Sequence, residues 1–219
     1  MSQRDPGGPM YVNPHFAERE LPVLQDIIEA VRFGVLVLCS DGPLAAHIPF
    51  VLHREEGRFG TLIAHVSARD PLARHLDGEH EALAIFSAPR AYVSPRWCPS
   101  GGLPTYNFLA VHAYGRPRRL QNPDVVLGHL RELVEVHEDR FSQPWSLASV
   151  ADEYVDERLP HITAFSLEID ALQGKRKLSQ NRTAEDREGI ISGLRERGGD
   201  DDLAIAKVMA SYSYSSREG

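Results

Sequence analysis

The apolar positions of the chain follow two different periods. Up to about residue 120, short apolar runs of strand-like composition alternate with clusters of turn residues. A single helical stripe precedes them, because residues 21–33 place their apolar side chains on one helix face. Asp70 is expected to cap a short helix that begins at Pro71. Strands are expected over residues 35–39, 44–53, 59–66, 82–87, 90–94, 104–114 and 116–120.

The remaining chain is mainly helical in period, with one further strand. Helices are predicted over residues 124–137, 146–154 and 202–209, and over the residues that follow the capping side chain of Thr183. Residues 162–172 alternate between apolar and polar positions and predict a strand. Because most strands follow one another directly, the order favours an antiparallel barrel over a βαβ sheet. We expect a mainly β, α+β fold: an antiparallel split β-barrel with peripheral and C-terminal helices.

The composition of the chain limits which partners and which cellular compartment are expected. Hydrophobic residues make up 42% of the 219 residues, and 24 basic against 31 acidic side chains give a net charge of −7. An acidic chain has no general attraction to DNA, so any nucleic-acid contact requires a local basic face. The sequence shows no apolar run long enough to span a bilayer and no signal peptide. With only Cys39, expected in the core, and Cys98, expected in an exposed loop, a cytoplasmic protein is predicted.

The densest polar chemistry lies in residues 175–182. Four cationic side chains occur there together with a hydroxyl, two carboxamides and one leucine, between a predicted strand and a predicted helix. Cations supply charge, the amides supply directional hydrogen bonds, and a helix N-terminus adds free N–H groups. The segment therefore predicts an anion site, with a phosphate as guest. The alternative is a solvated basic turn.

The sequence contains none of the common catalytic or nucleotide-binding motifs. No G-x-S-x-G elbow, Walker loop or G-x-G-x-x-G turn occurs, and no nucleophile stands beside a recognisable base. The ten histidines lack the register of a zinc helix, so no metal is predicted. His65 and His112 are expected on strands as structural side chains, with contact to the edge of a bound ligand as the alternative.

Seven segments in order resemble one family. The chain is similar to the PaiB-like proteins, called FMN-binding negative transcriptional regulators, which have the FMN-binding split-barrel fold. The resemblance implies FMN as cofactor, a role in repressing genes, and a homodimer with flavin sites at the subunit seam. The segments are MYVNPHF at 10–16, AHIP at 46–49, AHVSARDP at 64–71, AYVSPRW at 91–97, LPTYNF at 103–108, VH at 111–112 and residues 174–182.

Four positions depart from the family pattern. Ser67 and Asp70 replace an Ala-type and an Asn-type residue, and Asp70 adds a negative charge where a phosphate is expected. Tyr106 stands for a Trp and Cys98 for a Tyr, which thins the aromatic lining of the flavin site. A degraded flavin site is therefore one alternative.

The site residues combine resemblance with side-chain chemistry. Arg69, Lys177 and Arg182 are nominated for the phosphate; the alternatives are a salt bridge for Arg69 and a structural clasp for the other two. Gln180 and Asn181 are nominated for the ribityl chain or ring edge, or for holding the turn. Ser94 and Thr105 are nominated as hydroxyl donors to the phosphate, or as turn caps.

Three parts and three functions are predicted. The parts are a flexible tail at 1–9, a split barrel at 10–174, and a basic segment with helices at 175–219 packed on the barrel. The first function is an FMN-binding transcriptional regulator without a catalytic residue. The alternatives are an FMN-dependent oxidoreductase related to pyridoxamine-phosphate oxidases, and a scaffold that has lost FMN. The expected partners are FMN and a second copy of the chain, with DNA possible and no membrane.

Overall fold

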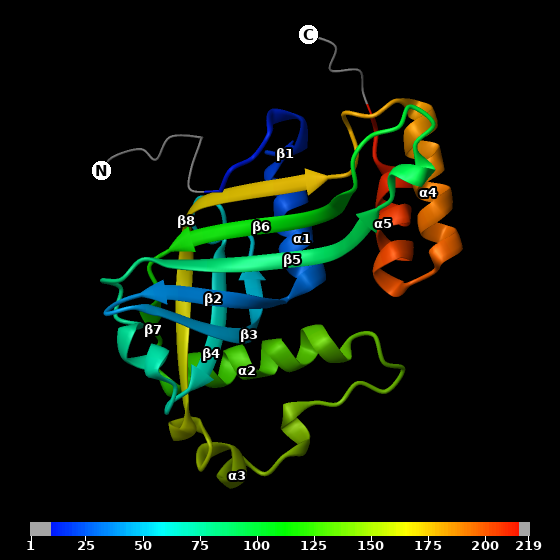
Figure 1. Ribbon diagram of the computed structural model, residues 1–219. Helices are drawn as coiled ribbons and strands as arrows, with labels where there is room; N and C mark the ends of the chain where they lie inside the picture. Colours follow the sequence, from blue (N-terminus) through cyan, green and yellow to red (C-terminus); the bar gives the residue numbers. More distant parts are fainter. Residues whose placement is uncertain (1–9, 215–219) are drawn as a thin grey trace. The chain divides into compact units, whose positions relative to one another are not determined.

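The strands form one antiparallel sheet that closes on itself. The computed structural model describes residues 10–214, and its strands follow the order β1-β8-β4-β3-β2-β5-β6. A further pairing of β8 with β6 closes the ring, and β7 pairs with β8 outside it (Figure 1). The bounds are β1 Ala17–Glu18, β2 Phe33–Cys39, β3 Pro43–His53, β4 Thr61–Ser67, β5 Ala82–Val93, β6 Thr105–Gly115, β7 Arg118–Arg119 and β8 Ile162–Lys177. The predicted antiparallel split-barrel fold is confirmed.

The described chain divides into two compact units. The first unit comprises residues 10–20, 87–111 and 173–214, and the second unit comprises residues 21–86 and 112–172. The boundaries fall inside β5, β6 and β8, so each of these strands contributes to both units. The split predicted at residues 174 and 175 stays a prediction, and the predicted tail at 1–9 lies outside the described residues.

The second unit is built around the hairpin of β2 and β3. Their register runs from Phe33↔Pro49 to Cys39↔Pro43, and β4 pairs in turn with β3 and β8. Helix α1 (Leu21–Val31) buries Leu24, Ile27 and Ile28, as its apolar stripe requires. The edge-to-face pair of Phe50 and Phe86, with ring centroids 5.2 Å apart, fills the interior.

Helix α2 (Pro123–Glu138) also belongs to the second unit. Asn122 caps it by accepting a hydrogen bond from the N–H of Asp124, and Pro123 occupies its first turn. The helix is largely polar, and His129 is its one buried side chain. A loop with the short helices η4 (Leu147–Ser149), α3 (Asp152–Asp156) and η5 (Leu159–His161) leads from α2 to β8.

The first unit holds a helical hairpin. Helix α4 (Ala184–Arg197) begins at Thr183, whose side chain accepts from the N–H of Asp186, and ends at Gly198, whose φ of 74° is left-handed. Helix α5 (Asp200–Ser211) packs on α4. Their fully buried side chains are Ile190, Leu194, Ile205, Ala206 and Met209.

Four sequence expectations are corrected. Residues 82–94 form one continuous strand, β5, instead of two, and the helix predicted at 146–154 is replaced by the separate short helices η4 and α3. Strand β8 continues to Lys177, beyond the predicted end at residue 172; β1 pairs with Gly174 and Lys175, and β8 also pairs with β6. The cysteines are reversed: Cys39, at the end of β2, is exposed, and Cys98 is buried.

A helix that crosses a bilayer must be both long and predominantly apolar. None between residues 10 and 214 is long and apolar enough to cross one.

Candidate functional site

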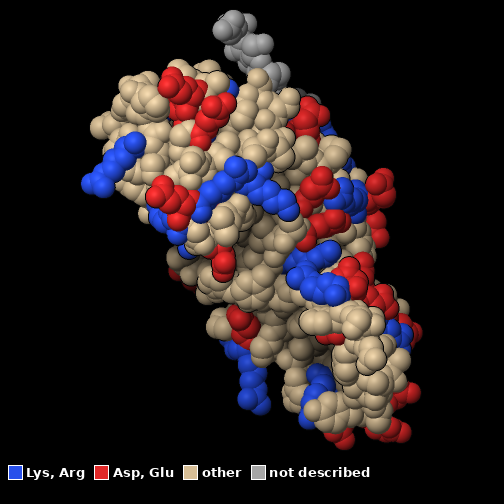
Figure 2. All heavy atoms as spheres, turned by 90° about the vertical axis from the view of Figure 1, so that its right-hand side faces the viewer, with Lys and Arg blue, Asp and Glu red and all other residues tan. Residues whose placement is uncertain are grey.

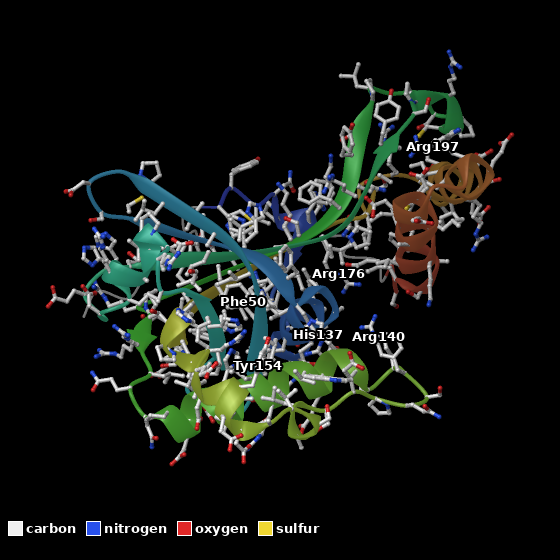
Figure 3. The ribbon with its side chains drawn as sticks, turned by 90° about the horizontal axis from the view of Figure 1, so that it is seen from below. Phe50, His137, Arg140, Tyr154, Arg176 and Arg197 are labelled. Atoms are coloured by element: carbon white, nitrogen blue, oxygen red, sulfur yellow. The ribbon has the colours of Figure 1, made fainter. Side chains whose placement is uncertain are left out.

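The basic side chains of the 175–182 segment alternate across strand β8. In an extended strand, residues two apart share a face, so Lys175 and Lys177 lie on one face and Arg176 on the other. Arg176, labelled in Figure 3, pairs with Glu18 at 2.9 Å and stacks over the ring of Tyr212. This arginine is therefore neutralised within the fold, and the two lysines are the cations available to a ligand.

The lysine face meets the start of β6 and the N-terminal segment. Lys177 Nζ donates a hydrogen bond to Thr105 Oγ1 and lies 5.8 Å from the ring centre of Phe16. Lys175 Nζ donates to the carbonyl of Tyr11 at 3.3 Å and lies 5.4 Å from the ring centre of Phe108. Of the predicted residues, Lys177 and Thr105 are thus brought into contact, although 72 positions separate them in sequence.

The two lysines repel each other. Burial, followed by the positive charge of Lys175, lowers the pKa of Lys177 below its usual value. No carboxylate forms an ion pair with either lysine among residues 10–214. A bound anion would relieve this repulsion, and Thr105 offers a hydroxyl beside it. We call Lys175, Lys177 and Thr105 the lysine cluster.

The turn after β8 is held by side chains of its own segment. Gln180 accepts a hydrogen bond from the N–H of Leu178 at 2.7 Å and donates to the carbonyl of Arg176. Ser179, with a left-handed φ of 60°, is buried and exchanges hydrogen bonds with the buried amide of Asn107. Gln180 therefore fixes this turn, and Asn181 is exposed beside it. A ribityl contact of either amide stays a prediction.

Arg182 joins two segments of the first unit. Its Nη1 donates to the carbonyl of Gly101 at 2.7 Å and lies 3.8 Å from the carboxylate of Asp186 in α4. The Asp186 carboxylate also accepts from the N–H of Ser100 at 3.0 Å, which lowers the pKa of Asp186 together with the Ser100 hydroxyl. Arg182 thus forms the structural clasp considered from the sequence, and its role toward a phosphate stays a prediction.

Two further nominated residues cap or border short helices. Ser94 caps the 3-10 helix η3 (Pro95–Trp97) by accepting from the N–H of Arg96 at 3.3 Å. Arg69 is exposed in the second unit, just after β4, and no salt bridge to Asp70 occurs in the described chain. Asp70 caps η2 (Pro71–His75) by accepting from the N–H of Leu72 at 2.9 Å. An Asn, the residue type of the family pattern at this position, would make the same cap, so Asp70 preserves the local structure.

Sequence reasoning missed two features. Lys175 was not nominated, although its spacing of two from Lys177 would have placed both on one face had β8 been extended through the segment. In the second unit, His53, His129 and Arg118 line a cavity of about 670 Å³. These residues are far apart in sequence, so no local motif reveals them.

Comparison with known proteins gives concordant results. The model of the family described as "Putative FMN-binding domain" matches residues 10–171. Protease synthase and sporulation protein PAI 2 of Bacillus subtilis is 25% identical over 201 residues, covering 91% of this chain and 96% of that protein. An uncharacterized protein of Emericella nidulans is 29% identical over 241 residues, with the same coverage of 91% and 96%.

The fold likewise has solved counterparts. The FAD and heme binding protein from Mycobacterium smegmatis superposes with a TM-score of 0.58 at 18% identity, over 84% of this chain and 80% of that one. At this identity the likeness concerns the fold. The family model spans most of the chain, and PAI 2 is similar over nearly its whole length. The chain is therefore a member of this FMN-binding split-barrel family and a relative of PAI 2.

Proposed function

We propose that the protein binds FMN and that the lysine cluster holds the FMN phosphate. The proposal rests on two half-buried lysines, Lys175 and Lys177, that lie on one face of β8. Neither lysine has a carboxylate counterion among residues 10–214. A phosphate dianion supplies the missing charge, and each charged hydrogen bond to it contributes about 1.5–3 kcal/mol. Family membership supports the choice of FMN among phosphorylated ligands.

The surroundings of the lysines also suit a flavin. A flavin ring is a flat, largely apolar surface that needs rings or aliphatic side chains beside it. Phe16 and Phe108 lie against the two lysines, and Tyr92 and Tyr106 of the same unit form an edge-to-face pair with ring centroids 5.8 Å apart. Tyr106 is 54% exposed, so its face is open to a ligand or partner. In this proposal, Phe16 and Phe108 supply the aromatic surface beside the two lysines.

The test uses two flavins that differ only in the phosphate. FMN and riboflavin are titrated into the full chain and followed by quenching of flavin fluorescence. Lys177→Ala should weaken FMN about tenfold or more, since it removes one charged hydrogen bond, and should leave riboflavin affinity within about twofold. Lys207→Ala, which removes an exposed lysine of α5 in the same unit, is the matched control.

The outcomes separate the alternatives. Equal FMN affinity in wild type and Lys177→Ala would overturn the assignment of the phosphate to the lysine cluster. Failure of both flavins to bind the wild-type chain would favour the scaffold that has lost FMN. A bound flavin that is bleached by a reduced nicotinamide would favour the oxidoreductase.

We propose further that the protein regulates transcription and that it acts indirectly. The support for a regulatory role is its relationship to PAI 2, a protein whose name refers to protease synthesis and sporulation. The net charge of −7 argues against direct DNA contact, and Figure 2 shows basic and acidic side chains interspersed over the visible face. A mobility-shift assay with random duplex DNA at low salt should show no complex. A complex that dissociates as salt rises would instead indicate direct contact.

A further inference from the structure

A cavity of about 670 Å³ lies in the second unit, and no residue of the lysine cluster lines it. Its size falls in the range of about 300–1,000 Å³ that is usual for small-molecule sites. One wall is the face of strands β3, β4, β7 and β8, and the other is helix α2. None of the residues nominated for FMN lines it.

The strand register orders the side chains of the sheet wall. His53, Thr61 and Glu168 are paired across β3, β4 and β8 and form one row. Ile63, Ser166 and Arg118 are paired across β4, β8 and β7 and form the next row. Residues two apart on a strand are about 7 Å apart, so Glu168 and Arg118 enter the cavity one row from each other. The wall therefore carries opposite charges at adjacent rows.

One residue that lines the cavity has a buried polar atom without a hydrogen-bond partner. His129, from α2, is 4% exposed, and its Nδ1 has no hydrogen-bond partner in the described part of the chain. Its Nε2 lies 3.1 Å from Nδ1 of His65. Burial, with smaller contributions from His65 and His53, lowers the pKa of His129 to about 4. The ring is therefore neutral at pH 7 and keeps one unused donor or acceptor.

The remaining charges sort into satisfied and unsatisfied groups. His53 bonds both Glu56 (3.0 Å) and Glu132 (2.8 Å), so these three side chains are paired with one another. The side chains of Arg118 and Glu168, both exposed, have neither an ion-pair nor a hydrogen-bond partner between residues 10 and 214. Arg116, the other arginine of the lining, donates a hydrogen bond to the carbonyl of Glu79. Arg118 and Glu168 are therefore the cation and the anion of the lining whose side chains have no partner in the described chain, and Ser166 and apolar Ile63 lie in the row of Arg118.

We infer that this cavity binds a free α-amino acid with an apolar side chain. A carboxylate meets the guanidinium of Arg118, and the ammonium on the adjacent carbon meets the carboxylate of Glu168. The apolar side chain packs against Ile63, Leu120 and Val125. A ligand with a single charge would leave either Arg118 or Glu168 unpaired beside it, which is why the zwitterion is the best match.

Helix α2 leaves room for this ligand at Gly128. A Cβ atom built at Gly128 would meet no other atom within 4 Å, and this residue lines the cavity. Glycine inside a helix costs about 1 kcal/mol relative to alanine. A larger residue here would therefore fill space without displacing a neighbour, which provides a means of blocking the site in a folded protein.

The test titrates the full chain with three matched probes by isothermal titration calorimetry. L-phenylalanine carries both charges, 3-phenylpropionate lacks the ammonium, and phenethylamine lacks the carboxylate; leucine and methionine test the side chain. Phenylalanine should bind at least tenfold more tightly than either singly charged analogue. Arg118→Gln and Glu168→Gln should each weaken it at least tenfold, and Gly128→Leu should abolish binding.

Two controls separate a loss of ligand from a loss of fold. Arg119→Gln alters the exposed neighbour of Arg118 on β7, which does not line the cavity, and should leave affinity within twofold. Circular dichroism melts identify any variant that fails to fold, and FMN titration gives a readout independent of this cavity. The proposal is overturned if none of the three amino acids binds, if 3-phenylpropionate or phenethylamine binds as tightly as phenylalanine, or if folded Gly128→Leu binds normally.

Discussion

At the scale of single residues, the neighbouring side chains determine the direction in which a histidine pKa shifts. His53 and His129 line the same cavity, yet their pKa values shift in opposite directions. Burial alone would lower the pKa of His53, but hydrogen bonds and negative charge from Glu132 and Glu56 more than offset burial and raise it. His129 has burial without a carboxylate partner, so its pKa falls to about 4. The pKa values of the two histidines are thus predicted to lie on opposite sides of the usual value.

These shifts predict how stability depends on pH. The raised pKa of His53 adds stability that is fully present below about 6.5 and is lost as pH rises through the folded-state pKa. Glu132→Gln should therefore lower the free energy of unfolding most at pH 5.5–6.5, by about 0.5–1 kcal/mol because both groups are partly exposed, and progressively less toward pH 8.5. Urea unfolding across this range measures the difference.

The control for this prediction is Glu29→Gln. Glu29 pairs with Arg54, which raises the pKa of Arg54 and lowers that of Glu29, so neither titrates between pH 5.5 and 8.5. The change that Glu29→Gln causes in the free energy of unfolding should therefore be constant between pH 5.5 and 8.5. An effect of Glu132→Gln that is equally constant would contradict the assigned role of His53.

His129 has the opposite effect on stability, because its lowered pKa removes stability as pH falls from 6.5 toward 4.

At the scale of elements, helix α4 shows how glycine serves packing. Gly189 and Gly193 lie one turn apart and contact Trp97, from η3. A Cβ at Gly193 would lie 2.3 Å from the indole ring, and one at Gly189 would lie 2.1 Å from the Trp97 carbonyl oxygen. Arg197 from the last turn of α4 lies over the same indole, 5.1 Å from its centre. Trp97 is consequently a packing residue between η3 and α4.

This contact reverses the usual effect of replacing glycine in a helix. Gly193→Ala should destabilise the protein by about 1–3 kcal/mol through overpacking against Trp97, although alanine is the better helix former. Gly128→Ala in α2, where a Cβ meets nothing, should stabilise it by about 0.5–1 kcal/mol. Thermal or urea unfolding of both variants provides the comparison. Stabilisation by Gly193→Ala would show that Trp97 does not pack on α4 in solution.

At the scale of the whole molecule, exposed apolar surface indicates self-association. Leu103 (81% exposed) and Tyr106 (54% exposed) stand in the first unit without the burial expected for their size. Tyr92, the ring partner of Tyr106, is also exposed at 38%. Large exposed apolar side chains that occur together are typical of interaction surfaces. We propose that these residues form the seam of a homodimer, as the family resemblance implies.

The native mass tests this proposal. Native mass spectrometry and light scattering should give twice the 24.4 kDa of the chain. Tyr106→Glu should shift the mass to that of a monomer, because it buries a charge in the seam. Tyr154→Glu, which alters a tyrosine of similar exposure in the second unit, should leave the dimer intact. A wild-type protein that is monomeric at micromolar concentration would refute the proposal.

Part of this structure follows from local sequence. Helix α1 and the hairpin of β2 and β3 are recognisable because their apolar period and turn residues lie within a few positions of each other. The same holds for the caps at Asn122 and Thr183, whose side chains bond to N–H groups two or three residues away. The uninterrupted order of strands determined the antiparallel barrel, because chain order limits how neighbouring strands pair.

Contacts over long sequence separation were decided by the tertiary structure. Pairing with β1 and β6 accompanies the extension of β8 into a polar segment whose composition resembles a turn, and the extended strand places Lys175 and Lys177 on one face. Thr105 reaches Lys177 across 72 positions, and Gly101 reaches Arg182 across 81. Strand pairing and burial depend on which segments meet in space, and no local pattern of residues specifies that. The sequence therefore indicated side chains whose chemistry suits a phosphate, while the register of the folded sheet determined which of them lie together.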